Sequence, residues 1–108
     1  MKTDRELLEL AAKAAELDVY WDTEYDRMTM DYDSKGGTNL EEWNPLTDDG
    51  DALRLAMHLN IETGFLQRVE KTIASYRLIT VSEKWENDKA RATRRAIVLV
   101  AAAIGGAA

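Results

Sequence analysis

The residues best suited to chemistry in this 108-residue sequence are cations gathered near its C-terminal end. Arg91 and Arg95 are spaced by one helical turn, close to the helix end where the dipole is positive. Cations there break a local rule, and such violations are frequent at functional sites. Guanidinium groups and free backbone amides bind phosphate well. An anion-binding site and pairing with nearby acids both remain open for the basic cluster of Lys84, Lys89, Arg91, Arg94 and Arg95.

Three aspartates, Asp48, Asp49 and Asp51, lie close together in the middle of the chain. Clustered carboxylates suit a hard cation, and a small magnesium-dependent phosphodiesterase would use them. Their spacing lacks the alternating ligands of a calcium loop. Because Pro45 keeps Asn44 from helical angles and acids favour the first turn of a helix, we interpret these aspartates as capping residues. We therefore predict no metal site and no cofactor.

Asp51, Arg54 and His58 are spaced by three and four residues, so they project from one side of a helix. A histidine beside an acid can act as a general base. The sequence has no cysteine and one histidine, and no recognisable nucleophile or oxyanion hole accompanies the triplet. We predict a polar helix face, no catalytic residues and a protein that is not an enzyme.

The three tryptophans are large side chains with two alternative uses. Trp21 occupies the inward phase of an expected strand, which favours the core. Trp43 precedes a helix and Trp85 ends a strand, so each is a candidate to stack on a planar ligand base; packing within the domain is the alternative. The candidate site for an anion or nucleotide therefore comprises Arg91, Arg94, Arg95, Lys89, Trp43 and Trp85.

Length and composition describe a single domain over residues 1–108, with 45% hydrophobic and 31% charged residues. Residues 1–50 carry 14 acids and 5 bases (net −9), and residues 51–108 carry 6 acids and 9 bases (net +3). A net negative chain is repelled by nucleic-acid duplexes. The longest apolar run, 96–104, is about half a membrane span. No signal peptide is visible, so we expect a cytoplasmic protein without membrane contact.

The elements that position these residues follow from changes in the hydrophobic period. Thr3 to Glu6 has the spacing of a capping box, and apolar residues at steps of three and four continue to Leu17. From Val19 the period is two, which predicts a hairpin connected at 23–27. Residues 33–39 are polar and rich in glycine, which predicts a loop.

The second half of the chain predicts two more helices around a second hairpin. Asn60 ends the second helix, and Gly105 with Gly106 stops the last one. Between them we expect two strands joined around 69–71, the second over 72–82, with a helix over 62–75 as the alternative. The cap candidates are Thr47, Asp48 and Asp49 for the second helix, and Asn87 and Asp88 for the last.

The expected fold is α+β: a four-stranded, mainly antiparallel sheet with helices packed over it, in the order α-β-β-α-β-β-α. Three blocks, LLELAAKAA (7–15), WNPLTDDGDALRLA (43–56) and ATRRAIV (92–98), resemble a group of short phage- and prophage-encoded proteins. The element order is similar to the phage α/β/α sandwich domain. The second hairpin departs from that group. The resemblance implies a phage origin, and small phage accessory proteins often act against host defences.

These observations lead to two hypotheses about function. The leading hypothesis is a non-catalytic counter-defence protein, in the cytoplasm of the infected bacterial host, that sequesters a phosphate-bearing small molecule or nucleotide signal. The alternative is a protein–protein inhibitor of a host defence complex that binds through its acidic first half, with binding weakened by salt. Because the apolar segment 101–104 exceeds what one helix face buries, we also expect a homo-oligomer.

Overall fold

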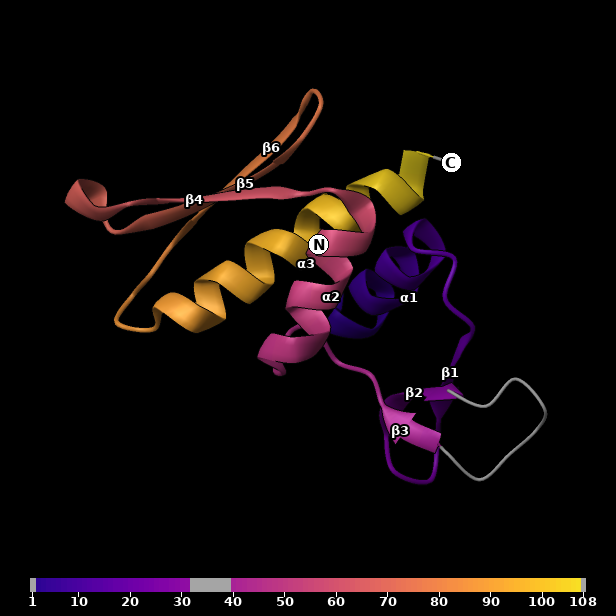
Figure 1. The fold of residues 1–108 in the computed structure, drawn as a ribbon. Helices are drawn as coiled ribbons and strands as arrows, with labels where there is room; N and C mark the ends of the chain where they lie inside the picture. The colour runs from indigo at the N-terminus through magenta and orange to yellow at the C-terminus, as the bar shows by residue number, and fades with distance from the viewer. Residues whose placement is uncertain (1, 32–39, 108) are drawn as a thin grey trace.

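The computed structural model describes residues 2–31 and 40–107, which fold into three helices and two antiparallel sheets (Figure 1). The predicted α+β class is confirmed. In chain order the elements are α1 (Asp4–Ala14), β1 (Val19–Asp22), β2 (Arg27–Asp31), β3 (Leu40–Glu42), α2 (Asp49–Leu59), β4 (Glu62–Leu66), a 3-10 helix (Gln67–Val69), β5 (Lys71–Tyr76), β6 (Ile79–Lys84) and α3 (Lys89–Ala107).

The strands of the described residues form two three-stranded sheets, ordered β1-β2-β3 and β4-β5-β6, in place of the single four-stranded sheet expected. One reason is that the segment 72–82 is two strands, divided by a two-residue turn at Arg77 and Leu78. Arg77 takes a left-handed φ of 53°. Without glycine, asparagine or aspartate in the turn, nothing in the sequence marks it. The other reason is β3, which pairs with β2 beyond the expected loop 33–39; that loop lies outside the described residues.

The remaining hairpin predictions hold. β1 and β2 pair antiparallel across a turn at 23–26, close to the predicted connection. β4 and β5 also pair antiparallel, joined by the 3-10 helix and Glu70, so the two strands expected around 69–71 are confirmed. The alternative helix over 62–75 is wrong, since the only helical residues in that range are the three of the 3-10 helix.

The predicted helix caps are formed by side chains. At α1, the Thr3 hydroxyl accepts the Glu6 backbone N–H at 3.2 Å, and the Glu6 carboxylate accepts the Thr3 backbone N–H at 3.3 Å. The second hydrogen bond lowers the pKa of Glu6 because it stabilises the charged carboxylate. At α2, Asp48 accepts the Asp51 backbone N–H at 2.8 Å. Asn60 ends α2 in the left-handed conformation, as predicted.

Helix α3 lies at the centre of the molecule. Its Val98, Val100 and Ala101 are completely buried. α1 packs along one side, β5 and β6 along another, and α2 along a third (Figure 1). Within the segment 101–104, which suggested self-association, Ala103 is the exposed residue and the others pack wholly or partly into the core. That segment therefore gives no reason for oligomerisation.

α1 and α3 approach closely at Gly105. A methyl group there would overlap the carbonyl oxygen of Leu10 and lie 3.3 Å from the Ala14 amide nitrogen, and neither backbone atom can move aside alone. At Gly106 a methyl group would meet nothing within 4 Å. The prediction that these glycines stop the helix is wrong, because α3 continues to Ala107. Gly105 is explained by close packing instead.

We expect Gly105→Ala to lower the free energy of unfolding by about 2–3 kcal/mol, because the added methyl forces α1 and α3 apart. Gly106→Ala is the matched control, since alanine favours a helix by about 1 kcal/mol over glycine and finds open space here. Urea denaturation followed by circular dichroism measures both. Equal effects of the two substitutions would contradict the close approach.

Candidate functional site

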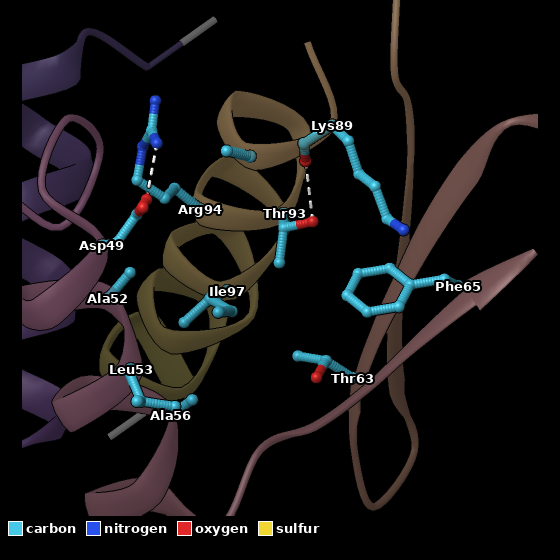
Figure 2. A pocket seen from close by; sticks show the side chains of 11 residues that line it. Asp49, Ala52, Leu53, Ala56, Thr63, Phe65, Lys89, Thr93, Arg94 and Ile97 are labelled. Atoms are coloured by element: carbon cyan, nitrogen blue, oxygen red, sulfur yellow. Dashed lines mark hydrogen bonds and ion pairs between the residues drawn. The ribbon is translucent and has the colours of Figure 1, made fainter.

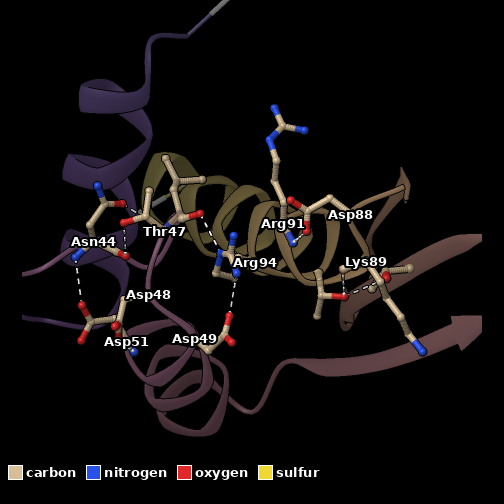
Figure 3. A network of polar contacts seen from close by, with 12 residues as sticks. Asn44, Thr47, Asp48, Asp49, Asp51, Asp88, Lys89, Arg91 and Arg94 are labelled. Carbon is tan, nitrogen blue, oxygen red and sulfur yellow. Dashed lines mark hydrogen bonds and ion pairs between the residues drawn. The ribbon is translucent and has the colours of Figure 1, made fainter. Parts of the chain in front are cut away.

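Two arginines of the predicted anion site have partners inside the protein. The Nε of Arg94 donates to the Leu46 carbonyl at 2.9 Å, and its Nη1 donates to the Asp49 carboxylate at 2.7 Å (Figure 3). Arg95 lies 3.5 Å from the carboxylate of Glu83. The Arg94 side chain is only 17% exposed. Arg94 therefore ties the start of α2 to α3, and this role accounts for it without a ligand.

Lys89 and Arg91 begin α3. The ammonium of Lys89 lies 4.2 Å from the ring centroid of Phe65 and 4.8 Å from that of Trp85, within cation–π range. Asp88 caps the helix by accepting the Arg91 backbone N–H at 2.9 Å, as predicted. The guanidinium of Arg91 has no acidic partner among the described residues and is exposed. Of the six predicted ligand residues, these two cations are the ones accessible to an anion.

Trp43 and Trp85 are buried, so neither ring has a free face on which a ligand base could stack. The Trp85 indole donates to the Thr72 hydroxyl at 2.9 Å, and that hydroxyl lies 2.9 Å from the hydroxyl of Thr93. Thr93 itself donates to the Lys89 carbonyl at 2.8 Å. Because each hydroxyl has one proton, Thr72 must donate to Thr93. This chain of hydrogen bonds joins β5 to α3.

The clustered aspartates all have structural roles. Asp48 caps α2, and Asp49 pairs with Arg94. Asp51 is buried and accepts the Asn44 backbone N–H at 3.0 Å (Figure 3). Capping and anchoring of the α2 start therefore explain the acidic motif. Within residues 2–31 and 40–107, no group of three or more histidine, aspartate or glutamate residues is placed to hold a metal ion.

Asp51, Arg54 and His58 on α2 lie in two different environments. Arg54 donates to the Asp51 carboxylate at 2.7 Å and lies 3.9 Å from that of Asp48. His58 is exposed one turn further and lines a small, mainly apolar hollow of about 170 Å³ with Arg54 and Leu17. Asp51 is buried and bonded to Arg54, so Arg54 and His58 are the exposed members of the triplet.

A mainly apolar groove of about 520 Å³ opens beside Lys89 and the Arg94–Asp49 pair. α2 forms one wall and β4 the other, and the N-terminal half of α3 forms the floor (Figure 2). The two walls are consecutive elements joined through Asn60 and Ile61. The apolar and neutral residues that line this groove include Ala52, Leu53 and Ala56 of α2, Thr63 and Phe65 of β4, and Ile97 of α3.

Large apolar side chains on both walls of the groove are exposed. Leu53 is 60% exposed and Phe65 53%, and Met57, one turn after Leu53, is 67% exposed. Every residue of β4 is exposed, and β4 is an edge strand of its sheet. Sequence reasoning missed this surface. Its signal was the Leu53–Met57 pair, a second apolar line on α2 outside the buried stripe.

Arg94→Ala is expected to lower the free energy of unfolding by about 2–3 kcal/mol, because it leaves the partly buried Leu46 carbonyl without its charged donor. Asp49→Ala should cost less than about 1 kcal/mol, since that carboxylate is 78% exposed. Urea denaturation of the two variants and of the double variant separates the contributions. If Arg94→Ala left the free energy of unfolding unchanged, the wild-type guanidinium would have no structural role, and a ligand-binding role would be open to it.

Thr72→Val should lower the free energy of unfolding by about 2–3 kcal/mol, because it leaves the buried Trp85 indole N–H without an acceptor. Thr72→Ser keeps the hydroxyl and should cost only about 1 kcal/mol for the lost methyl. NMR reports on the bond directly: the Trp85 indole proton should exchange faster with solvent in the valine variant alone. Equal exchange in both variants would refute the hydrogen-bond chain.

No helix in the described part of the chain is both long and apolar enough to cross a membrane. Comparisons with protein-family models, curated proteins and solved structures find no match for this chain. The site therefore rests on its own geometry: an apolar groove with one accessible cation at its mouth, beside an unpaired strand edge.

Proposed function

We propose that this chain is a non-catalytic protein-interaction module and that the groove between α2, α3 and β4 is its binding site. The observation that carries the proposal is the exposure of Leu53 and Phe65, which face solvent from opposite walls of one apolar groove. Exposed apolar surface of this kind marks sites where proteins meet. The phage resemblance supports a role as a small accessory protein acting by binding.

The residues that line the groove favour an apolar protein segment as its ligand over a multiply charged small molecule. Arg94 is neutralised by Asp49, and Arg95 lies beside Glu83 outside the groove. Lys89 is then the single unneutralised cation of the lining. Phosphate receptors use several converging donors, commonly bidentate arginine. One lysine beside apolar walls matches a protein surface with apolar side chains and one carboxylate better.

The groove lining also supports a binding function over catalysis. Asp49, Lys89 and Arg94 are its titratable side chains, and two of these form an ion pair. The Thr93 hydroxyl is already hydrogen-bonded to the Thr72 hydroxyl and to the Lys89 carbonyl. Proton transfer needs an acid or base with a free partner position at the reacting atom, and the lining offers no such pair.

A phosphate-bearing small molecule is the second candidate, favoured by Lys89 resting on the exposed ring of Phe65 at the mouth of the groove. The groove volume also lies within the range of about 300–1,000 Å³ that small-molecule sites occupy. Titration calorimetry with cyclic nucleotides and ADP-ribose derivatives tests it. Heat that disappears in Lys89→Ala would favour this candidate over the protein segment.

The interaction function is tested by replacing Phe65 with photoreactive benzoylphenylalanine in the full chain inside the producing cell. We expect irradiation to give a covalent protein adduct, and we expect Leu53→Asp to reduce its yield at least about tenfold, because a buried unpaired charge opposes docking. The control is the same probe at Leu78, which is fully exposed but lies at the β5–β6 turn away from the groove.

Leu78→Asp, combined with the probe at Phe65, is the matched substitution and should leave the adduct yield unchanged. Equal adducts from positions 65 and 78, or no protein adduct at position 65, would overturn the proposal. An adduct that resists Leu53→Asp in the cell, and that is lost when a lysate of the same cells is irradiated at raised salt, would instead indicate binding through the acidic first half of the chain.

A further inference from the structure

β4 is an edge strand without the features that normally protect one. β5 pairs with one of its edges, and no strand of the described residues pairs with the other. Natural edge strands are blocked by lysine, proline, bulges or a covering element. β4 has no lysine or proline, and its one charged residue is Glu62 at the first position. At its centre, Gly64 has open space where a side chain would be.

The register of the sheet assigns its two faces. Thr72 and Ala74 of β5 are completely buried, and Thr72 bonds to Thr93 of α3, so they mark the inner face. The cross-strand partners of these two residues in β4 are Phe65 and Thr63, which therefore face the same side as the groove. The outer face carries the alternate residues of each strand.

Charge is separated between the two ends of this outer face. Leu66, Lys71 and Lys84 form one cross-strand row, in which two lysines are direct neighbours. Glu62, Ser75 and Thr80 form another row. Within one chain, Glu62 and Lys71 are offset by four residues along the strand, roughly 13 Å, so they are too far apart to pair. The lysine row therefore lacks a carboxylate neighbour in its own row.

From these observations we infer that the protein taken up at this site is a second copy of the same chain. The two β4 strands pair antiparallel about a twofold axis through Gly64 and form one continuous six-stranded sheet. Glu62 of each copy then stands opposite Leu66 of the other, in line with the lysine row. Glu62 and Lys71 of the other copy are two strand spacings apart, roughly 10 Å between Cα atoms, which their extended side chains span. This inference rests on the proposed interaction function and names its partner.

Strand pairing also brings the groove into the interface. β5 occupies one edge of β4, and β4 is a wall of the groove, so a strand added at the other edge of β4 brings the second copy next to the groove. Pairing over five residues alone is weak, and apolar burial must add to it. The exposed Leu53 and Met57 of α2 and Phe65 of β4 supply that burial. The interface is isologous, because the same surface serves both copies.

Sedimentation velocity of the full chain tests the inference. We expect the wild type to sediment as a species of twice the 12.2 kDa chain mass. Gly64→Lys should raise the dimer dissociation constant at least about tenfold, because it places two lysines face to face on the twofold axis. Gly64→Thr is the matched control. It adds a neutral β-branched side chain in the same open space and should keep the dimer.

A charge exchange tests the register. Glu62→Lys should weaken the dimer, because it extends a row that already holds two lysines. Lys71→Glu should weaken it as well. The double variant should restore at least half of the lost affinity, since each copy again offers opposite charges across the interface. Circular dichroism of each variant confirms that the monomer fold is retained.

A wild type that stays monomeric up to millimolar concentration would overturn the inference, and so would a dimer unaffected by Gly64→Lys. The photo-cross-linking experiment with the probe at position 65 distinguishes failure of the dimer inference from failure of the proposed function. A photo-adduct with a different protein, together with a monomeric chain, leaves the interaction site standing and excludes the second copy. No adduct at position 65 removes both.

Discussion

The burial of α3 is the constraint on which the rest of the structure depends. A helix of 19 residues with completely buried positions such as Ala96, Val98 and Ala101 needs neighbours on several sides. α1 covers one side, β5 with β6 another and α2 a third. The strip that includes Ala90, Thr93 and Ile97 is left as the floor of the groove. The candidate site is thus the part of the α3 surface that α1, α2 and the second sheet leave open.

Packing against α3 accounts for three segments of the chain, residues 7–15, 43–56 and 92–98. Residues 7–15 belong mainly to α1 and pack on α3 near Gly105. Residues 43–56 contain the Asp48 cap and the Leu46 carbonyl, and Arg94 of the third segment binds that carbonyl. These motifs describe how two helices are fixed to a third. They carry structural information, and β4 lies outside all three of them.

What could be predicted from the sequence was local. A helix cap or a left-handed helix end involves residues only a few positions apart. The roles of Thr3, Asp48 and Asn60 at helix ends could therefore be predicted from the sequence. The turn at Arg77 was not, because its positive φ is imposed by the pairing of β5 with β6 and not by a residue that prefers it. Gly105 was misread for a related reason: its neighbour is the Leu10 carbonyl, far away in sequence.

The candidate site was predictable only in part, because the exposure of a side chain depends on tertiary contacts that the sequence does not give. The basic cluster was found, yet the chain itself supplies partners for Arg94 and Arg95. Leu53, like Met57, falls outside the buried stripe of α2, and exposed apolar residues are ordinary at such positions. It gains meaning only when β4 places Phe65 across the groove from it. No spacing along the chain relates these two residues.

The Arg94–Asp49 pair links the stability of the fold to the polarity of the groove. It lies in the lining of the groove, where an unpaired guanidinium would attract anions and ordered water. Neutralised by Asp49 and bound to the Leu46 carbonyl, Arg94 leaves apolar walls and the single ammonium of Lys89. The contact that fixes α2 on α3 therefore also keeps the lining of the groove mainly apolar. A ligand rich in phosphate would have to break that contact before it could use the arginine, and so would bind at the expense of the fold.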